Sequence, residues 1–145
     1  MLDPRGPRVN AAVTLAVFAV VLVTGWGWLA LAQAAVFAIT AVNPKAGPYG
    51  LLFRATVRPR LKPPTELEPA APFRFAQTVG FVFAAVAGGA FLTGATALGL
   101  VAAGCGLAAA FLNAVFGLCL GCELYLAARR MAGRAVPARV PVPSD

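Results

Sequence analysis

Residues 75–122 read FAQTVGFVFAAVAGGAFLTGATALGLVAAGCGLAAAFLNAVFGLCLGC and contain no Asp, Glu, Lys or Arg. A second uncharged run covers residues 9–44. The hydrocarbon core of a bilayer is about 30 Å thick, so one helical crossing needs about 20 apolar residues at about 1.5 Å per residue. Each run is too long for one crossing and suits two. The sequence therefore predicts an all-α membrane protein with four transmembrane helices arranged as two hairpins.

The overall composition also indicates a membrane domain. The chain has 145 residues, of which 60% are hydrophobic and 12% are charged, and its net charge is +7. A soluble domain carries about 25% charged residues. The aromatic residues lie in the apolar runs and are not interleaved with Lys and Arg, which argues against nucleic acid as a partner. We expect the basic residues to meet the lipid bilayer and its anionic headgroups.

Turn residues divide each run in two. The expected spans cover residues 9–24, 28–42, 75–92 and 97–128, within a single domain of residues 1–133 that is followed by a disordered tail over 134–145. Two other interpretations of the first run are one long tilted span and a signal peptide cleaved after Ala32. The apolar sequence continues to Val42 without a polar region, which favours the hairpin.

The basic residues predict how the protein faces the membrane. The two hairpins place both chain ends and the polar segment 43–74 on one side, and all twelve basic residues fall there. Lys and Arg accumulate on the cytoplasmic side of membrane proteins. We therefore expect the N- and C-termini to be cytoplasmic.

The polar segment begins with an amphipathic stretch over residues 49–58. At about 100° per residue, one face of a helix would carry Tyr49, Leu52, Phe53, Thr56 and Val57, and the opposite face Arg54 and Arg58. This pattern predicts a cytoplasmic helix lying in the headgroup region, with both arginines directed to lipid phosphates.

Small residues at four-residue spacing predict where the helices approach one another. They form three rows: Ala30, Ala34 and Ala38; Gly80, Ala84 and Gly88; and Gly106, Ala110 and Ala114. Small side chains let backbones come close in lipid, where no hydrophobic force drives helices together. We expect a compact bundle, with a free row available for a homo-oligomer.

Candidate chemistry rests on thiols, because the chain has three cysteines and no histidine. Cys119 and Cys122 form a C-x-x-C pair. Such a dithiol can carry reducing equivalents or sulfur. Alternatively, the two thiols supply half of a zinc site that a dimer would complete, or they are small apolar residues in a packed helix. Cys105 is expected to belong to a packed helix face.

The position of the pair on its helix affects its reactivity. Near the C-terminus of a continuous helix, and beside Glu123, the helix dipole disfavours a thiolate. A helix break at Gly117 would reverse this by placing the cysteines at a new N-terminus. Asn113 is a supporting candidate for a hydrogen bond or a solute contact, and Glu123 for pairing with an arginine of residues 54–74 or contact with water.

Five stretches together resemble a bacterial membrane family, domain of unknown function 4395. They are DPRGPR at 3–8, YGLLFR at 49–54, RPRL at 58–61, RFAQ at 74–77 and FGLCLGCELY at 116–125. The resemblance implies a multi-pass protein of the bacterial cytoplasmic (inner) membrane without an established activity, whose relatives are encoded near sulfurtransferase- and thioredoxin-like genes. Only Cys119 and Cys122 carry over as candidate site residues.

Together these observations predict thiol redox chemistry or sulfur handling at the cytoplasmic membrane face, through Cys119 and Cys122. The expected partner is a cytoplasmic thioredoxin-like protein or sulfurtransferase. Two alternatives are a non-catalytic membrane subunit or scaffold, and a small-solute transporter acting as an oligomer. No cofactor or metal is expected, and whether the protein is an enzyme stays open.

Overall fold

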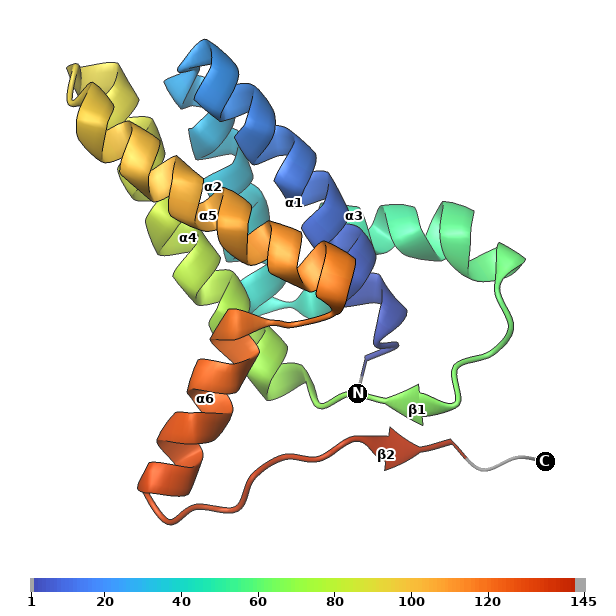
Figure 1. Ribbon diagram of the computed structural model, residues 1–145. Coiled ribbons are helices and arrows are strands. Elements are labelled where there is room, and N and C mark those ends of the chain that lie inside the picture. Colours follow the sequence, from blue (N-terminus) through green and yellow to red (C-terminus); the bar gives the residue numbers. More distant parts are fainter. Residues whose placement is uncertain (1, 143–145) are drawn as a thin grey trace.

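The computed structural model describes residues 2–142 and is mainly helical, as predicted (Figure 1). Its α-helices are α1 (Arg5–Thr24), α2 (Gly27–Val42), α3 (Pro48–Leu52), α4 (Ala70–Thr93), α5 (Thr96–Phe116) and α6 (Leu120–Met131). A π-helical turn (Phe53–Val57) and a 3₁₀ turn (Arg58–Arg60) extend α3, and another 3₁₀ turn (Pro44–Ala46) follows α2. Two short strands, β1 (Glu66–Leu67) and β2 (Val140–Pro141), pair antiparallel.

Three of these helices are long and apolar enough to cross a membrane. They are α1, α4 and α5, with 20, 24 and 21 residues. Helix α2 is apolar but has 16 residues, which is about 24 Å of helix. Large apolar side chains such as Val23, Leu98 and Val101 are more than half exposed on these helices. Extensive apolar surface is unusual on a soluble monomer, and these features are compatible with a multi-pass membrane protein.

The helices pack through small residues. Helix α1 packs on α5, and α2 packs on α4. A Cβ atom on Gly27 would lie 2.9 Å from the carbonyl oxygen of Gly88, so the backbones of α2 and α4 touch. Ala30 of α2 and Ala84 of α4 are completely buried. The predicted rows of small residues in these two helices therefore form a helix–helix contact.

Hydrogen bonds between polar side chains connect α1, α2 and α3. The Tyr49 hydroxyl donates to Oε1 of Gln33, and Nε2 of Gln33 donates to the Thr14 hydroxyl at 3.4 Å. The Thr14 hydroxyl donates to Oδ1 of Asn10, also at 3.4 Å. Gln33, Thr14 and Asn10 are buried. These hydrogen bonds tie α3 to α2 and α1, which holds the segment after α2 against the bundle.

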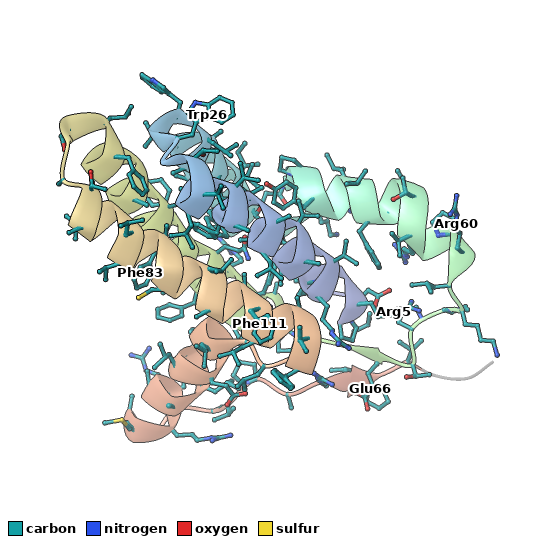
Figure 2. All side chains as sticks on the ribbon, turned by 45° about the horizontal axis from the view of Figure 1, so that its top comes forward. Arg5, Trp26, Arg60, Glu66, Phe83 and Phe111 are labelled. Atoms are coloured by element: carbon teal, nitrogen blue, oxygen red, sulfur yellow. A yellow bond between two sulfur atoms is a disulfide. The ribbon has the colours of Figure 1, made fainter. Side chains whose placement is uncertain are left out.

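The two ends of the bundle differ. The connections between α1 and α2 and between α4 and α5 lie at one end, and the N-terminus, β1 and α6 lie at the other (Figure 1). Figure 2 places Trp26 at the first end, remote from Arg5 and Glu66. The second end, which carries the chain's basic residues, is called the basic end below.

The last predicted span differs from the structure. The helix predicted over 97–128 is two helices, α5 and α6, because the chain turns at Gly117. The disorder expected for the tail over 134–145 stays a prediction, and the structure describes this tail up to residue 142. There β2 pairs with β1, and Arg139 contacts Glu68 at 2.6 Å. Residues 143–145 lie outside the described residues.

The amphipathic stretch predicted over 49–58 is helical from Pro48 to Arg60 but changes helix type along its length. Phe53 is buried against Gly6 of α1, whereas Leu52 of the predicted apolar face is exposed. The apolar face with which this segment packs against the bundle is therefore narrower than predicted. Leu51 and Leu52, each about half exposed, leave an apolar edge on the outside.

Candidate functional site

A sharp turn separates α5 from α6. Gly117 has φ 68° and ψ 16°, a left-handed conformation that costs other residues energy. Its N–H donates to the carbonyl oxygen of Asn113 at 3.0 Å, and the N–H of Leu118 donates to that of Leu112 at 3.2 Å. These are the capping hydrogen bonds of a glycine-terminated helix. The break at Gly117 places the C-x-x-C pair at the start of a new helix.

Cys119 is the N-cap residue of α6. Its backbone is extended, and its Sγ accepts the N–H of Cys122 at 3.2 Å. The two cysteines form a disulfide with Cα atoms 5.2 Å apart. The free N–H groups and positive dipole end of a helix N-terminus stabilise a thiolate. On a continuous helix the dipole would disfavour a thiolate at Cys119, whereas at this N-terminus the dipole favours it.

Close packing on α4 fixes the position of α6. A Cβ atom on Gly121 would lie 2.7 Å from the Cα of Ala76, so the first turn of α6 rests on the α4 backbone. One turn later, the rings of Tyr125 and Phe75 have centroids 5.7 Å apart. Gly121 lies between the two cysteines, so this contact positions the disulfide directly.

A cavity of about 440 Å³ opens beside the disulfide at the basic end. We call it the polar cavity. Both cysteines line it, together with Arg5, Arg8, Glu68, Asn113, Glu123 and Arg139. Arg5 pairs with Asp3 at 2.8 Å and Arg139 pairs with Glu68 at 2.6 Å, which neutralises two of the three arginines.

Arg8 has a different kind of partner. Its Nη2 donates to the carbonyl oxygens of Ala114 and Val115, each at 3.3 Å, at the C-terminus of α5. The side chain also reaches Gly117, where a Cβ atom would lie 3.8 Å from its Nε. A cation complements the negative end of a helix dipole. Arg8 thus places a positive charge at the turn that carries Cys119.

Two carboxyl groups near the polar cavity have shifted pKa values. The hydrogen bond from Arg5 holds the pKa of Asp3 below its ordinary value. Burial raises the pKa of Glu68, although Arg139 acts in the opposite direction. Both groups lie where the N-terminus, β1 and the tail meet. Asp3 is next to Leu2, which exchanges two backbone hydrogen bonds of 2.7 Å with Glu68, and Glu68 pairs with Arg139 of the tail.

A second cavity, of about 300 Å³, lies inside the bundle on the other side of the same turn. We call it the bundle cavity. Its lining comes from α1, α2, α4, α5 and the start of α6, and includes Phe18, Phe37, Phe83, Gln77, Asn113 and Cys119. Cys119 lines both cavities, whereas Cys122 lines the polar cavity. Cys119 therefore lies where a polar and a largely apolar cavity adjoin.

The structure brings some of the sequence candidates together. Cys119, Cys122, Asn113 and Glu123 line the polar cavity. Glu123 is exposed, and within residues 2–142 it forms no ion pair, so the pairing expected with residues 54–74 is not observed. Arg54 and Arg58 line a separate cavity of about 290 Å³ beside Phe53, away from the cysteines.

Cys105, Arg8 and Gln77 also line these cavities. Cys105 is a free, exposed thiol that lines the bundle cavity. Within residues 2–142 no group of three or more His, Cys, Asp or Glu side chains could hold a metal ion. Sequence reasoning missed Arg8, whose role depends on a contact across 106 residues. Gln77, a polar residue within the uncharged run 75–122, also lines the bundle cavity, which the sequence alone does not show.

These features define a class: an all-helical protein with membrane-length apolar helices and a disulfide at the N-cap of a short helix. The chain belongs to the family described as domain of unknown function (DUF4395), whose family model matches residues 2–130. This confirms the resemblance seen in the sequence. No curated protein and no solved structure matches the chain significantly.

Proposed function

We propose that this protein is a thiol–disulfide redox protein of the bacterial cytoplasmic membrane. Its Cys119–Cys122 pair exchanges electrons with a thiol of a thioredoxin-like protein or sulfurtransferase at the basic end. The observation that carries the proposal is the position of Cys119, which lines the polar cavity and whose Sγ caps α6. A helix N-cap combines thiolate stabilisation with access, which are the two requirements of a reactive cysteine.

The membrane arrangement in this proposal has four spans, with α2 as the fourth, shorter span. The basic end then faces the cytoplasm because Lys and Arg accumulate there. Helix α6 carries Glu123, Arg129 and Arg130 and lies outside the hydrocarbon region. The segment 48–60 lies at the headgroups, with Arg58 and Arg60 exposed toward lipid phosphates.

In the exchange reaction, a partner thiolate attacks one sulfur of the disulfide and the other sulfur leaves as a thiolate. The resulting mixed disulfide is resolved when the partner's second thiol attacks, which releases the dithiol form of the pair. Two electrons and two protons reach the pair in one cycle. We assign Cys119 as the sulfur that the partner attacks and Cys122 as the sulfur that leaves first. The N-cap position then stabilises the thiolate of Cys119 when the partner's second thiol resolves the mixed disulfide.

The test uses the purified protein in detergent, with Cys105→Ser in every variant so that the pair supplies the reacting thiols. A thioredoxin that lacks its resolving cysteine is charged as an aromatic mixed disulfide and offered to Cys122→Ser and to Cys119→Ser. We expect a covalent complex with Cys122→Ser, formed at least tenfold faster than with Cys119→Ser. Mass spectrometry then locates the bond at Cys119.

Equal and slow rates for the two variants would contradict the assignment of Cys119. A pair that stays oxidised in excess dithiothreitol, or that no thioredoxin reduces, would contradict the redox function altogether. That result would favour the non-catalytic scaffold, in which the disulfide only holds α6 at the end of α5.

A further inference from the structure

We infer that the bundle cavity binds a lipid-soluble quinone, which takes electrons from the reduced Cys119–Cys122 pair. The inference rests on the proposed function and names the second substrate of the same site. It is carried by three observations: a cavity of suitable size inside the apolar bundle, an unpaired buried amide in its wall, and Cys119 at its end.

The size and lining of the cavity suit a flat, uncharged ring. Its volume of about 300 Å³ is at the lower end of the range for small-molecule sites. Aromatic side chains of Phe18, Phe37 and Phe83 contribute to the wall, and the lining contains no Asp, Glu, Lys or Arg. A charged substrate would lose its hydration here without gaining a counter-ion, so the cavity selects against it.

The cavity is accessible from the side of the bundle that would face lipid. Phe83 of α4 and Leu124 of α6 both line it and are exposed on the outer surface, by 37% and 59%. Phe83 belongs to α4, one of the proposed spans, so a ligand dissolved in the hydrocarbon region can reach the cavity past Phe83 without crossing the polar cavity.

The wall also offers hydrogen bonds of the kind that a quinone uses. Gln77 lines the cavity and is 7% exposed, and its Oε1 has no hydrogen-bond partner within residues 2–142. A buried amide without a partner costs free energy. The Nε2 of Gln77 can donate to a carbonyl oxygen of the quinone or to a hydroxyl oxygen of the quinol product. Gln77 can therefore bind both redox forms.

The electron balance of the step is complete. The dithiol gives up two electrons and its two thiol protons, and a bond forms between Sγ of Cys119 and Sγ of Cys122. The quinone accepts these electrons and protons, and its two carbonyl groups become the two hydroxyl groups of the quinol. The oxidised product is the disulfide that the structure contains.

The test measures reduction of decylubiquinone by the chemically reduced protein in lipid nanodiscs, followed by the ultraviolet absorbance of the quinone. We expect one quinol and one Cys119–Cys122 disulfide per protein. Ala109→Phe fills the cavity and should slow the reaction at least tenfold. Ala108→Phe adds the same ring at the neighbouring exposed position of α5 and should leave the rate within twofold of the unchanged protein.

A second variant covers the case in which Ala109→Phe does not fold. Gln77→Leu keeps the side-chain volume and should raise the quinone concentration at half-maximal rate by about tenfold, the loss of one buried hydrogen bond of about 1.4 kcal/mol. Thr78→Val on the exposed face of α4 is its control.

The outcomes separate the two proposals. A protein that exchanges with thioredoxin but does not reduce decylubiquinone would overturn the quinone site and leave the redox function intact. Equal rates for Ala109→Phe and Ala108→Phe would also overturn the site, because the quinone would then react elsewhere. Failure with both thioredoxin and quinone would overturn both proposals.

Discussion

Arg8 donates a hydrogen bond from its Nη2 to the carbonyl oxygen of Ala114 at 3.3 Å, joining the first turns of α1 to the last turn of α5. Replacing Arg8 with Met keeps the apolar part of the side chain and removes the charge. We expect alkylation of the reduced Cys119 to slow about two- to fivefold, since a charge at a helix end contributes about 0.5–1 kcal/mol.

The measurement is the rate of iodoacetamide reaction at neutral pH in a background that carries both Cys105→Ser and Cys122→Ser. Arg58→Met is the matched control, because Arg58 is exposed and does not line the polar cavity. If both variants react at the same rate, the charge of Arg8 does not act on Cys119.

Replacing Gly117 with Ala should destabilise the protein, because an L-residue in this left-handed conformation is strained by about 1–2 kcal/mol. Asn adopts the conformation more easily than Ala. The unfolding temperature of Gly117→Asn, followed by circular dichroism, should therefore lie between those of the unchanged chain and Gly117→Ala. A Gly117→Ala protein as stable as the unchanged chain would show that α5 and α6 do not need this turn.

Gly121→Ala should push α6 away from α4, because the added Cβ would lie 2.7 Å from the Cα of Ala76. Overpacking of this kind costs about 1–3 kcal/mol. The readouts are the unfolding temperature and the rate at which dithiothreitol reduces the disulfide. Gly104→Ala is the control, since a Cβ there meets no atom within 4 Å; an equal effect of both substitutions would argue against the α4–α6 contact.

Asp3→Asn tests the link between the N-terminus and Arg5. The pKa of Asp3 is lower in the folded protein than its ordinary value of 3.8. Its ionised form therefore stabilises the fold above that value, and the contribution disappears as the pH falls through the lower folded pKa. We expect Asp3→Asn to unfold at a lower temperature than the unchanged chain at pH 7, and the difference to vanish in strongly acidic buffer. A difference that is constant with pH would mean that the carboxylate charge is not responsible.

The proposed orientation is tested with reporter fusions that are active on one side of the membrane. Fusions after Trp26 and after Gly94 should report the side opposite to the cytoplasm, and a fusion after Met131 the cytoplasm. A cytoplasmic signal at Trp26 alone would indicate that the first uncharged run does not form two spans.

The helical fold was predictable because it follows from charge and hydropathy along the chain. The turns near Gly25 and Gly94 coincide with polar or small residues, so the C-terminal ends of α1 and α4 were predicted closely, whereas both helices begin four to five residues earlier than predicted. The break at Gly117 was not predicted as part of the fold, because the apolar run continues past it to Cys122. The only local signal of a turn was the glycine itself, and many glycines in apolar helices lie within an unbroken helix.

The site was predictable in part. The spacing of Cys119 and Cys122 identified the pair, but their place at a helix N-terminus depends on the turn before them. The contribution of Arg8 depends on packing of α1 against α5, which no local pattern records. Gln77 and Gln33 are both polar residues within uncharged runs, and only the three-dimensional arrangement shows that Gln33 is paired and Gln77 borders a cavity.

Because Cys119 lines both cavities and both proposed substrates react with the same Cys119–Cys122 pair, the pair can react with one substrate at a time. A water-soluble thiol and a lipid-soluble oxidant would reach it from opposite sides and never meet in a ternary complex. Turnover would then follow ping-pong kinetics, with parallel double-reciprocal plots, and neither substrate would have to cross the membrane boundary.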